Sequence, residues 1–286
     1  MLHTSKITCA VQPEGRTFGR VALFGGVYSN HVALRAAIED AARRGCERMF
    51  CLGDLGAFGP NPDKVFPLLI DAGVVTMQGN YDNSIGNNLS DCQCGYTDPA
   101  DNHYARLSYQ YTYRKTSERW RRWLALLPAE IRFELTDEAY GSAVGFQKRV
   151  LCCHGSPRKM NEFLWESTTP THLLEKLCDD CHADVIVATH TGLPWTRELS
   201  RGRLFVNCGV LGRPPNDGTP RVGYAILDAT APQHAQYVPL DYDQEALAAE
   251  MEAEELPPPF VETIRTGWWT TCLEILPARE RARGRF

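Results

Sequence analysis

The chain has 286 residues, a formal net charge of −5 and a hydrophobic fraction of 43%. This length fits one large α/β domain, or one domain with an appendage, with ample apolar material for a core. The weakly acidic balance gives no reason to expect a nucleic-acid partner. No stretch approaches the roughly 20 apolar residues of a transmembrane helix. Residues 1–20 lack an apolar signal core, so we expect a cytoplasmic protein without membrane contact.

The first half of the chain alternates apolar strands with helices, which is typical of an α/β fold. In order, we expect a strand at 21–26, a helix at 31–44 capped by Asn30, a strand at 49–52, a helix at 62–72 and a strand at 74–77. Residues 83–130 interrupt this alternation. They contain a polar loop followed by helices at 103–115 and 117–127.

The second half resumes the strands. We expect strands at 131–135, 149–152, 185–189, 204–207 and 222–227, an edge strand at 237–240, and helices at 171–181, 244–255 and 260–276. Trp268 and Trp269 are expected to pack the last helix against the body. We therefore divide the chain into an N-terminal tail (1–18), a main domain (19–240) with a helical insertion (83–130), and a helical C-terminal extension (241–286).

The chain has eleven cysteines, an odd number, so they cannot all be paired with one another in disulfides. Several lie in apolar strands and are expected to act as small buried hydrophobes: Cys51, Cys152, Cys153 and Cys208. The pairs Cys92/Cys94 and Cys178/Cys181 could bind a metal or form redox pairs. A zinc site needs both pairs in suitable geometry, and the second pair lies in a predicted helix. We favour structural roles for both.

Four polar side chains follow apolar strands at the points where those strands end. They are Asp54, Asn80, His154 and His190. In open α/β sheets, ligands bind at the carboxyl ends of the strands, so we expect these side chains to face one site. Carboxylate and amide oxygens with two imidazoles suit Zn, Mn, Fe or Co. One such histidine is usually an ordinary loop residue, but four metal-competent groups at strand ends predict a metal centre.

These residues lie within short motifs that occur in a characteristic order. The motifs are Gly53-Asp54-Leu55-Gly56, Gly79-Asn80-Tyr81-Asp82, His154-Gly155-Ser156-Pro157 and Thr189-His190-Thr191. In this order they resemble the calcineurin-like metallophosphoesterases, most closely their small bacterial, fruiting-body-protein-like branch. The segment 207–210 is similar to that branch's Asn-Pro-Gly-Ser, with Cys208 and Val210 as departures. The similarity runs from about Val21 to Asp228.

The resemblance implies a four-layer α/β/β/α sandwich, here with the helical insertion and the helical C-terminal tail. In that family two metals share one carboxylate, activate a water and clamp the phosphoryl oxygens. The resemblance implies that Asp54 is the bridging carboxylate. Asn80, His154 and His190 would complete the shell of the second metal.

The ligands of the first metal are missing from the matching positions. Where the family has Asp-x-His-Gly-Asn, this chain has Gly26-Val27-Tyr28-Ser29-Asn30, and the family's Gly-His-Thr-His corresponds to Thr189-His190-Thr191-Gly192. Glycine thus replaces an aspartate at 26 and a histidine at 192, and Tyr28 replaces another histidine. Tyr81 also replaces a general-acid histidine, a variation familiar in the small bacterial branch. We expect one metal site and leave the second open.

Three explanations of this altered centre are open. Tyr28 could bind ferric iron as a phenolate, as a tyrosine does in the related purple acid phosphatases. The centre could use one metal, with Tyr28 or Arg158 supplying the lost charge and hydrogen bonds. The protein could also bind a phosphate-containing ligand without cleaving it. The candidates for orienting phosphate or relaying a proton are Asn30, Tyr28, Tyr81 and Asp82, and those for meeting phosphate are Arg158 and Arg213.

The function predicted from the sequence is hydrolysis of a small phosphoric ester, either a monoester or a diester, by metal-activated water. The alternative is a catalytically inactive protein that binds a metal or a phosphate-containing ligand on the same fold. The substrate, the choice among Mn, Fe, Zn and Co, and the oligomeric state stay open.

Overall fold

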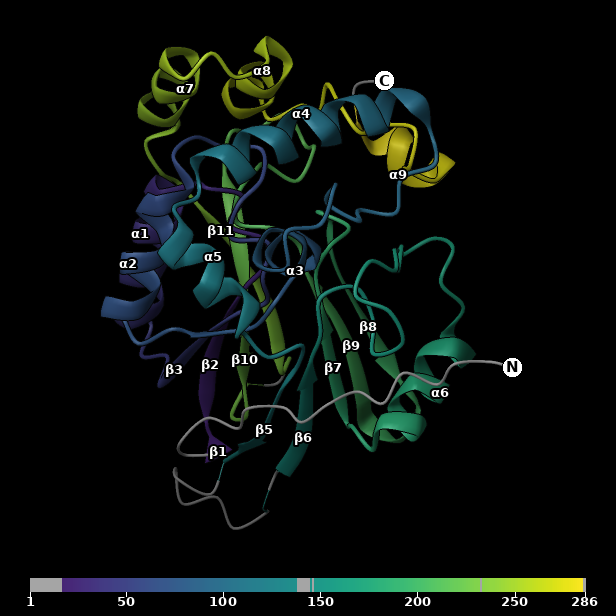
Figure 1. Ribbon diagram of the computed structural model, residues 1–286. Helices are drawn as coiled ribbons and strands as arrows, with labels where there is room; N and C mark the ends of the chain where they lie inside the picture. The colour runs from purple at the N-terminus through teal and green to yellow at the C-terminus, as the bar shows by residue number, and fades with distance from the viewer. Residues whose placement is uncertain (1–16, 138–144, 146, 232, 285–286) are drawn as a thin grey trace.

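The computed structural model describes residues 17–137, 145, 147–231 and 233–284, which form two packed β-sheets flanked by helices (Figure 1). The first sheet has the strand order β1-β5-β6-β7-β9-β8 and the second the order β11-β10-β2-β3-β4. In the first sheet, β6, β7 and β9 run parallel, and β5 and β8 pair antiparallel at either side of them. In the second, β2, β3 and β4 run parallel.

The strands are short, and apart from β1 and β8, which were not predicted, each lies at a predicted apolar run. In the first sheet they are β1 (Thr17–Phe18), β5 (Ile131–Thr136), β6 (Gln147–Cys152), β7 (Val185–Ala188), β8 (Pro194–Leu199) and β9 (Arg203–Cys208). In the second they are β2 (Arg20–Phe24), β3 (Arg48–Cys51), β4 (Val75–Thr76), β10 (Val222–Asp228) and β11 (Ala235–Leu240). The predicted edge strand is confirmed, because β11 is the outermost strand of its sheet.

Three apolar layers hold the sandwich together. Between the sheets, Phe50 of β3 stacks on Phe133 of β5 with ring centroids 4.6 Å apart. On the outer face of the second sheet, α1 (His31–Arg43) and α2 (Val65–Asp71) bury their apolar sides. On the outer face of the first sheet, α6 (Thr171–Cys181) buries Leu174 and Leu177. The predicted four-layer α/β/β/α sandwich is therefore confirmed.

Of the remaining helices, α4, α7, α8 and α9 gather at one end of the sandwich (Figure 1). The bounds of all the remaining helices are η1 (Pro62–Lys64), α3 (Asn80–Gly86), α4 (Pro99–Lys115), α5 (Glu118–Ala125), η3 (Ser200–Gly202), α7 (Gln244–Ala253), α8 (Pro258–Thr266) and α9 (Ala278–Arg283). Residues of α4, of α8 and of the segment after α8 line one cavity together with Asp54 and His190. The helical insertion and the C-terminal segment thus cover the strand ends that carry the site.

The predicted secondary structure is wrong in several places, among them three that bear on the site and its cover. The helix predicted at 260–276 ends at Thr266, because Gly267 adopts a left-handed conformation with φ +76°. Residues 194–199 form β8, which pairs with β9 and lacks the apolar alternation by which strands are recognised. Asn80 lies in the first turn of α3, directly after Gly79, rather than in a loop.

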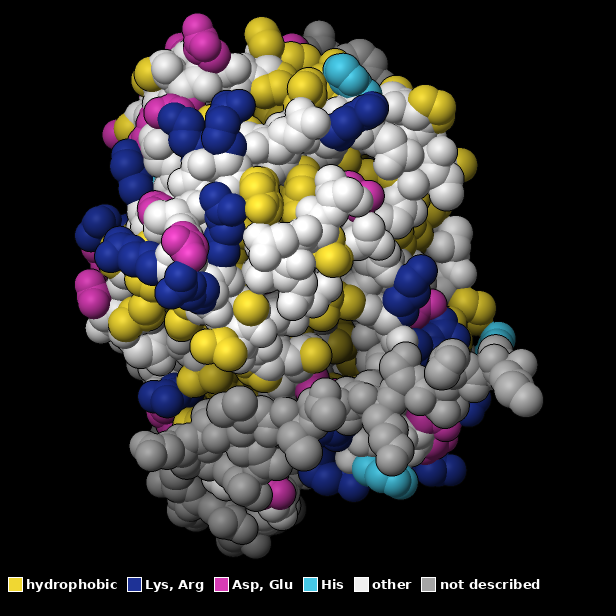
Figure 2. Space-filling view, in the orientation of Figure 1, with side chains coloured by type: hydrophobic (Ala, Val, Ile, Leu, Met, Phe, Trp, Pro, Cys, Tyr) yellow, Lys and Arg dark blue, Asp and Glu magenta, His cyan; other side chains and the backbone are white. Residues whose placement is uncertain are grey.

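The surface carries mixed charges on the face shown in Figure 2, where Lys and Arg side chains gather around α5 with acidic side chains among them. Arg122 of α5 is ion-paired with Glu118 of the same helix. Within the described residues, no helix is both long and apolar enough to cross a bilayer.

The interface between the two sheets can be tested with Phe50→Ala. Phe50 is fully buried and stacked on Phe133, so its truncation should lower the free energy of unfolding by about 3–5 kcal/mol. The control is Leu126→Ala, because Leu126 is 80% exposed and its loss should change stability by no more than about 0.5 kcal/mol. Urea unfolding followed by circular dichroism measures both, and equal effects would contradict the assignment of this core.

Candidate metal centre

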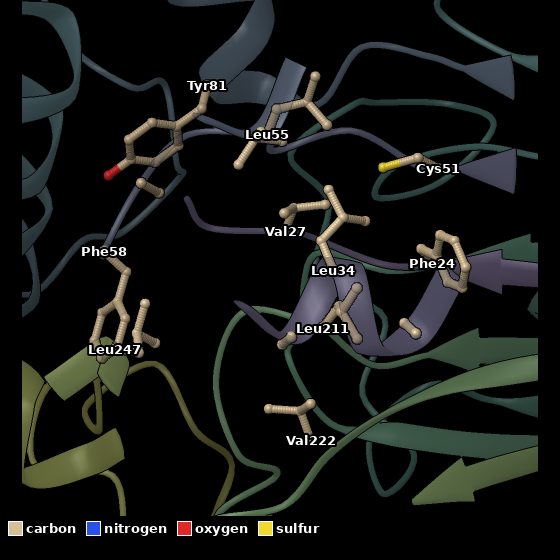
Figure 3. Close-up of a cluster of buried hydrophobic side chains, with 14 of the residues drawn as sticks. Phe24, Val27, Leu34, Cys51, Leu55, Phe58, Tyr81, Leu211, Val222 and Leu247 are labelled. Carbon is tan, nitrogen blue, oxygen red and sulfur yellow. The ribbon is translucent and has the colours of Figure 1, made fainter. Parts of the chain in front are cut away.

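Asp54 lies at the turn that follows β3, and its backbone is held by the neighbouring loop. Asp54 has a φ of +53°. Its carbonyl oxygen accepts hydrogen bonds from the backbone N–H groups of Val27 and Tyr28 at 2.9 and 3.0 Å. Figure 3 shows Val27, Leu34, Leu55 and Leu211 gathered beside this turn. The turn that carries Asp54 is therefore held by backbone hydrogen bonds and follows directly on residues of the buried core.

A second carboxylate, that of Asp82, organises the same turn. Asp82 is fully buried and accepts hydrogen bonds from the backbone N–H groups of Asp54 at 2.6 Å, Leu55 at 3.1 Å and Gly79 at 2.8 Å. Burial, and then the charge of Asp54, raise the pKa of Asp82 to about 7. Asp82 thus joins the turn after β3 to the start of α3, rather than facing the centre itself.

Asn80 is brought beside Asp54 by a glycine that allows close approach. A Cβ at Gly79 would lie 2.3 Å from Asp54 Oδ1 and 2.7 Å from His154 Cε1, so a larger residue does not fit there. The Nδ2 of Asn80 donates to the Cys92 carbonyl at 2.8 Å. Its Oδ1 is buried and has no hydrogen-bond partner among the described residues. This orphaned oxygen is available to a cation.

His154 and His190 follow the neighbouring parallel strands β6 and β7, which place them side by side. The Nδ1 of His154 lies 2.7 Å from the Leu52 carbonyl, so this nitrogen is a donor, and Nε2 is the nitrogen that can take either a metal or a second proton. That Nε2 lies 3.2 Å from Asp54 Oδ2 and 3.3 Å from His190 Nδ1. Two imidazole nitrogens and a carboxylate oxygen therefore converge.

The charges of this cluster act on one another at close range. Burial raises the pKa of Asp54, but the charge of His154 and its hydrogen bond outweigh burial and hold this pKa below its ordinary value. Burial lowers the pKa of His154, yet the charge of Asp54 raises it above 6.5 overall. Burial, then the charge of His154, lower the pKa of His190 to about 3. His190 is thus neutral and competent as a ligand near pH 7.

The cluster fits a transition metal. The ligand atoms of Asp54, His154 and His190 all lie within 4.8 Å of one another. Ligands about 2.0–2.1 Å from a tetrahedral metal lie about 3.3 Å apart, which agrees with the 3.2 and 3.3 Å separations of this cluster. The orphaned Oδ1 of Asn80 adds a fourth donor. Two nitrogens, a carboxylate and an amide oxygen suit Zn, Mn, Fe or Co.

The residues at the expected first metal do not fit a metal. A Cβ at Gly26 would lie 2.6 Å from Cε1 of Tyr28, so the tyrosine ring fills the space of the missing aspartate. Gly192 has φ +81°, and a Cβ there would lie 2.8 Å from Cη2 of Trp269. An indole and a phenol thus fill the space that the missing ligands would need.

Of the two arginines expected to meet phosphate, the structure brings only Arg213 to the centre. Arg213 lines a cavity of about 50 Å³ together with Asp54, Asn80 and His190. Arg158 instead forms an ion pair with Glu162 in the loop after His154 and is not among the described residues that line this cavity.

The other candidate residues have well-defined contacts. Tyr28 and Tyr81 line the cavity, and the Tyr81 hydroxyl lies 3.1 Å from Ser108 Oγ in α4. Asn30 caps α1, accepting from Ala33 N at 2.9 Å, as the sequence predicts. Its Nδ2 donates to the Gly212 carbonyl at 3.3 Å, so both ends of its amide are occupied.

Some residues at the centre were not found from the sequence. Cys92 and Cys94 are joined by a disulfide, and the backbone of Cys92 orients Asn80. Trp269 and Thr271 come from the segment after α8, and Thr271 lines the cavity. The Cys92/Cys94 pair and Trp269 stand out in the sequence, but their place beside the centre follows only from the tertiary fold, and no local pattern marks Thr271.

The fold is similar to that of two solved structures. A metallophosphoesterase from Sphaerobacter thermophilus is 24% identical with a TM-score of 0.63, covering 87% of this chain and 98% of that one. A hypothetical protein from Pyrococcus horikoshii is 20% identical with a TM-score of 0.70, covering 89% of this chain and 100% of that one. An uncharacterized protein of Methanocaldococcus jannaschii is 25% identical over 224 residues, 73% of this chain and 82% of the relative.

No family model matches the chain. The architecture is therefore that of the metallophosphoesterases, as the order of the sequence motifs predicts.

Metal analysis of single variants tests the ligand set. We expect Asp54→Ala, His154→Ala and His190→Ala each to lose most of the metal that the parent binds, because each removes a converging donor. The double variant Cys178→Ser, Cys181→Ser is the control and should keep full metal content. Full retention in all three ligand variants, or an equal loss in the control, would contradict the assignment.

The metal affinity should depend on pH through His154. Because Asp54 raises the pKa of His154 above 6.5, a proton competes with the metal as the pH falls toward 6, and binding releases that proton. The affinity should therefore fall by about tenfold for each pH unit below this pKa. Calorimetric titrations at pH 6, 7 and 8 measure this dependence, and a constant affinity across the range would contradict the role of His154.

Proposed function

We propose that this protein hydrolyses phosphoric esters at a metal centre held by Asp54, Asn80, His154 and His190. The observation that carries the proposal is the convergence of three buried ligand atoms, those of Asp54, His154 and His190, beside a cavity that is also lined by Asn80, whose Oδ1 has no hydrogen-bond partner among the described residues. When bound, the metal would lower the pKa of a coordinated water and neutralise phosphoryl charge. The metallophosphoesterase fold supports this reaction class, and the cytoplasmic location stays an expectation from the sequence.

The residues of the chain have separable roles in this proposal. His154 offers Nε2 as a ligand because its Nδ1–H is committed to the Leu52 carbonyl. Asp54 holds the negative charge of the centre, and the N–H of Tyr81 donates to its Oδ1 at 3.0 Å. Asp82 acts as a positioning residue through its hydrogen bonds to the turn that carries Asp54.

Tyr28 is the proposed hydrogen-bond donor to a phosphoryl oxygen. Burial, then the charge of Asp54, raise the pKa of Tyr28, which keeps its hydroxyl protonated at neutral pH. The ring lines the same cavity as Asp54 and Arg213. A protonated phenol here would complement an anionic oxygen at the place where the first metal's ligands are missing.

The second candidate function is binding of a phosphate-containing ligand without cleavage. It is favoured by one observation, the occupation of the expected first-metal space by Tyr28 and Trp269. Both candidates use the same ligand set and the same cavity, so turnover separates them.

An activity panel tests the proposal. Protein purified without chelators and supplied with Mn, Fe, Zn or Co should hydrolyse p-nitrophenyl phosphate or bis(p-nitrophenyl) phosphate. We expect His154→Ala to lower kcat/KM by about 100-fold or more, because a metal supplies several kcal/mol of charge stabilisation. The double variant Cys178→Ser, Cys181→Ser should retain the parent activity. Metal-loaded parent protein that cleaves neither substrate would favour the binding protein instead.

A further inference from the structure

Arg213 is a buried cation without a counterion. The residue is 6% exposed, and its Nε has no hydrogen-bond partner within the described part of the chain. Among the described residues, no carboxylate oxygen lies within 4.0 Å of the Arg213 guanidinium, which is the separation expected of an ion pair. By contrast, Arg203, which is similarly buried, pairs with Asp179 at 2.6 Å. Burying a charge without a counterion costs free energy of folding. An anionic ligand bound beside Arg213 would offset that cost.

Trp269 holds this guanidinium in place. The Cζ of Arg213 lies 3.5 Å from the centroid of the Trp269 ring, which is the geometry of a cation–π contact. Trp269 is fixed by two hydrogen bonds. Its indole Nε1–H donates to the Pro214 carbonyl at 2.7 Å, and its backbone N–H donates to Asn216 Oδ1 at 2.8 Å. The C-terminal segment therefore presents Arg213 in one orientation.

The guanidinium lies where the first metal's ligands are absent. A Cβ at Gly192 would lie 3.4 Å from Arg213 Nη2 and 2.8 Å from Trp269, so the arginine and the indole extend into the space of the missing histidine. The positive φ of Gly192, +81°, also disfavours any larger residue there. The positive charge on this side of the centre thus comes from the protein.

Arg213 lines the same cavity as Asp54, Asn80 and His190. The cavity has a volume of about 50 Å³ and is also lined by Tyr28 and Thr271. The Thr271 hydroxyl is buried and has no hydrogen-bond partner among the described residues. The cavity therefore combines three of the four proposed metal ligands, a guanidinium without a counterion, a protonated phenol and an unpaired hydroxyl.

We propose that Arg213, held by Trp269, forms an oxyanion site that stands in for a first metal ion and binds the dianionic phosphoryl group of a phosphomonoester. The claim that a phosphomonoester is cleaved here rests on the proposed function, whereas the claim that Arg213 binds its phosphoryl group does not. The planar guanidinium can donate to two phosphoryl oxygens at once. A guanidinium together with a bound metal cation gives this cavity, which is also bordered by Tyr96, Tyr104 and Phe260, two positive groups. These complement the double charge of a monoester phosphoryl group better than the single charge of a diester.

Calorimetric titration of inorganic phosphate into the metal-loaded protein tests the site. We expect Arg213→Gln to weaken phosphate binding by about 10- to 100-fold, because charge-assisted hydrogen bonds are lost, with its metal content unchanged. Arg213→Lys should recover only part of the affinity. The control is Arg201→Gln, whose side chain is 78% exposed and whose loss should leave the affinity unchanged. Unchanged affinity in a folded Arg213→Gln variant would overturn the proposal.

Trp269→Phe is the second variant, for the case that Arg213→Gln does not fold. It keeps an aromatic ring but loses the Nε1–H bond to Pro214, so phosphate affinity should fall by about 3- to 10-fold. Near-ultraviolet circular dichroism checks both folds. Parent-like affinity in a folded Trp269→Phe protein would overturn the role given to the indole.

Two further titrations, with methyl phosphate and dimethyl phosphate, test the substrate class. Methyl phosphate should bind about as tightly as inorganic phosphate, and dimethyl phosphate at least about tenfold more weakly. Equal affinities would overturn the assignment to monoesters. Arg213-dependent phosphate binding in a protein that cleaves no ester would leave this site standing and refute the hydrolase, whereas an active enzyme with Arg213-independent binding would refute the site alone.

Discussion

One buried carboxylate, that of Asp82, holds together the turn on which the metal centre depends. It accepts backbone N–H groups from Asp54, Leu55 and Gly79, which belong to the loop after β3 and the start of α3. Without these bonds, three buried N–H groups would be unsatisfied, each at a cost of about 1–3 kcal/mol. The Asp54 carboxylate would also lose its fixed position beside His154. The chemistry of Asp54 therefore depends on a residue that does not itself face the cavity.

The two sheets contribute the ligands in equal share. The second sheet supplies Asp54 after β3 and Asn80 after β4, and the first supplies His154 after β6 and His190 after β7. The parallel strands of each sheet end at the same edge, and the packing of Phe50 on Phe133 sets the two edges side by side. The helical insertion and the C-terminal segment then cover this edge, which removes the ligands from bulk water. Burial strengthens the electrostatic coupling among them.

Much of the framework could be predicted from the sequence, because local patterns determine it. The helix at Thr171–Cys181 has the predicted bounds, the strands follow the apolar runs, and the polar residues that end them converge. What escaped prediction depends on long-range contacts. Strand β8 is defined by its pairing with β9, and the position of Trp269 is set by Pro214 and Asn216. The isolation of Arg213 from carboxylates, likewise, follows only from the tertiary fold.

We propose that the centre combines one metal site and one guanidinium. The ligands of a single metal converge, and Tyr28, Trp269 and Arg213 take up the space in which a second would be expected. The most direct measurement is anomalous X-ray diffraction from crystals of protein loaded with Zn or Mn. We expect one anomalous peak, within bonding distance of Asp54, Asn80, His154 and His190. Two peaks flanking Asp54, or a peak remote from these four residues, would contradict this proposal.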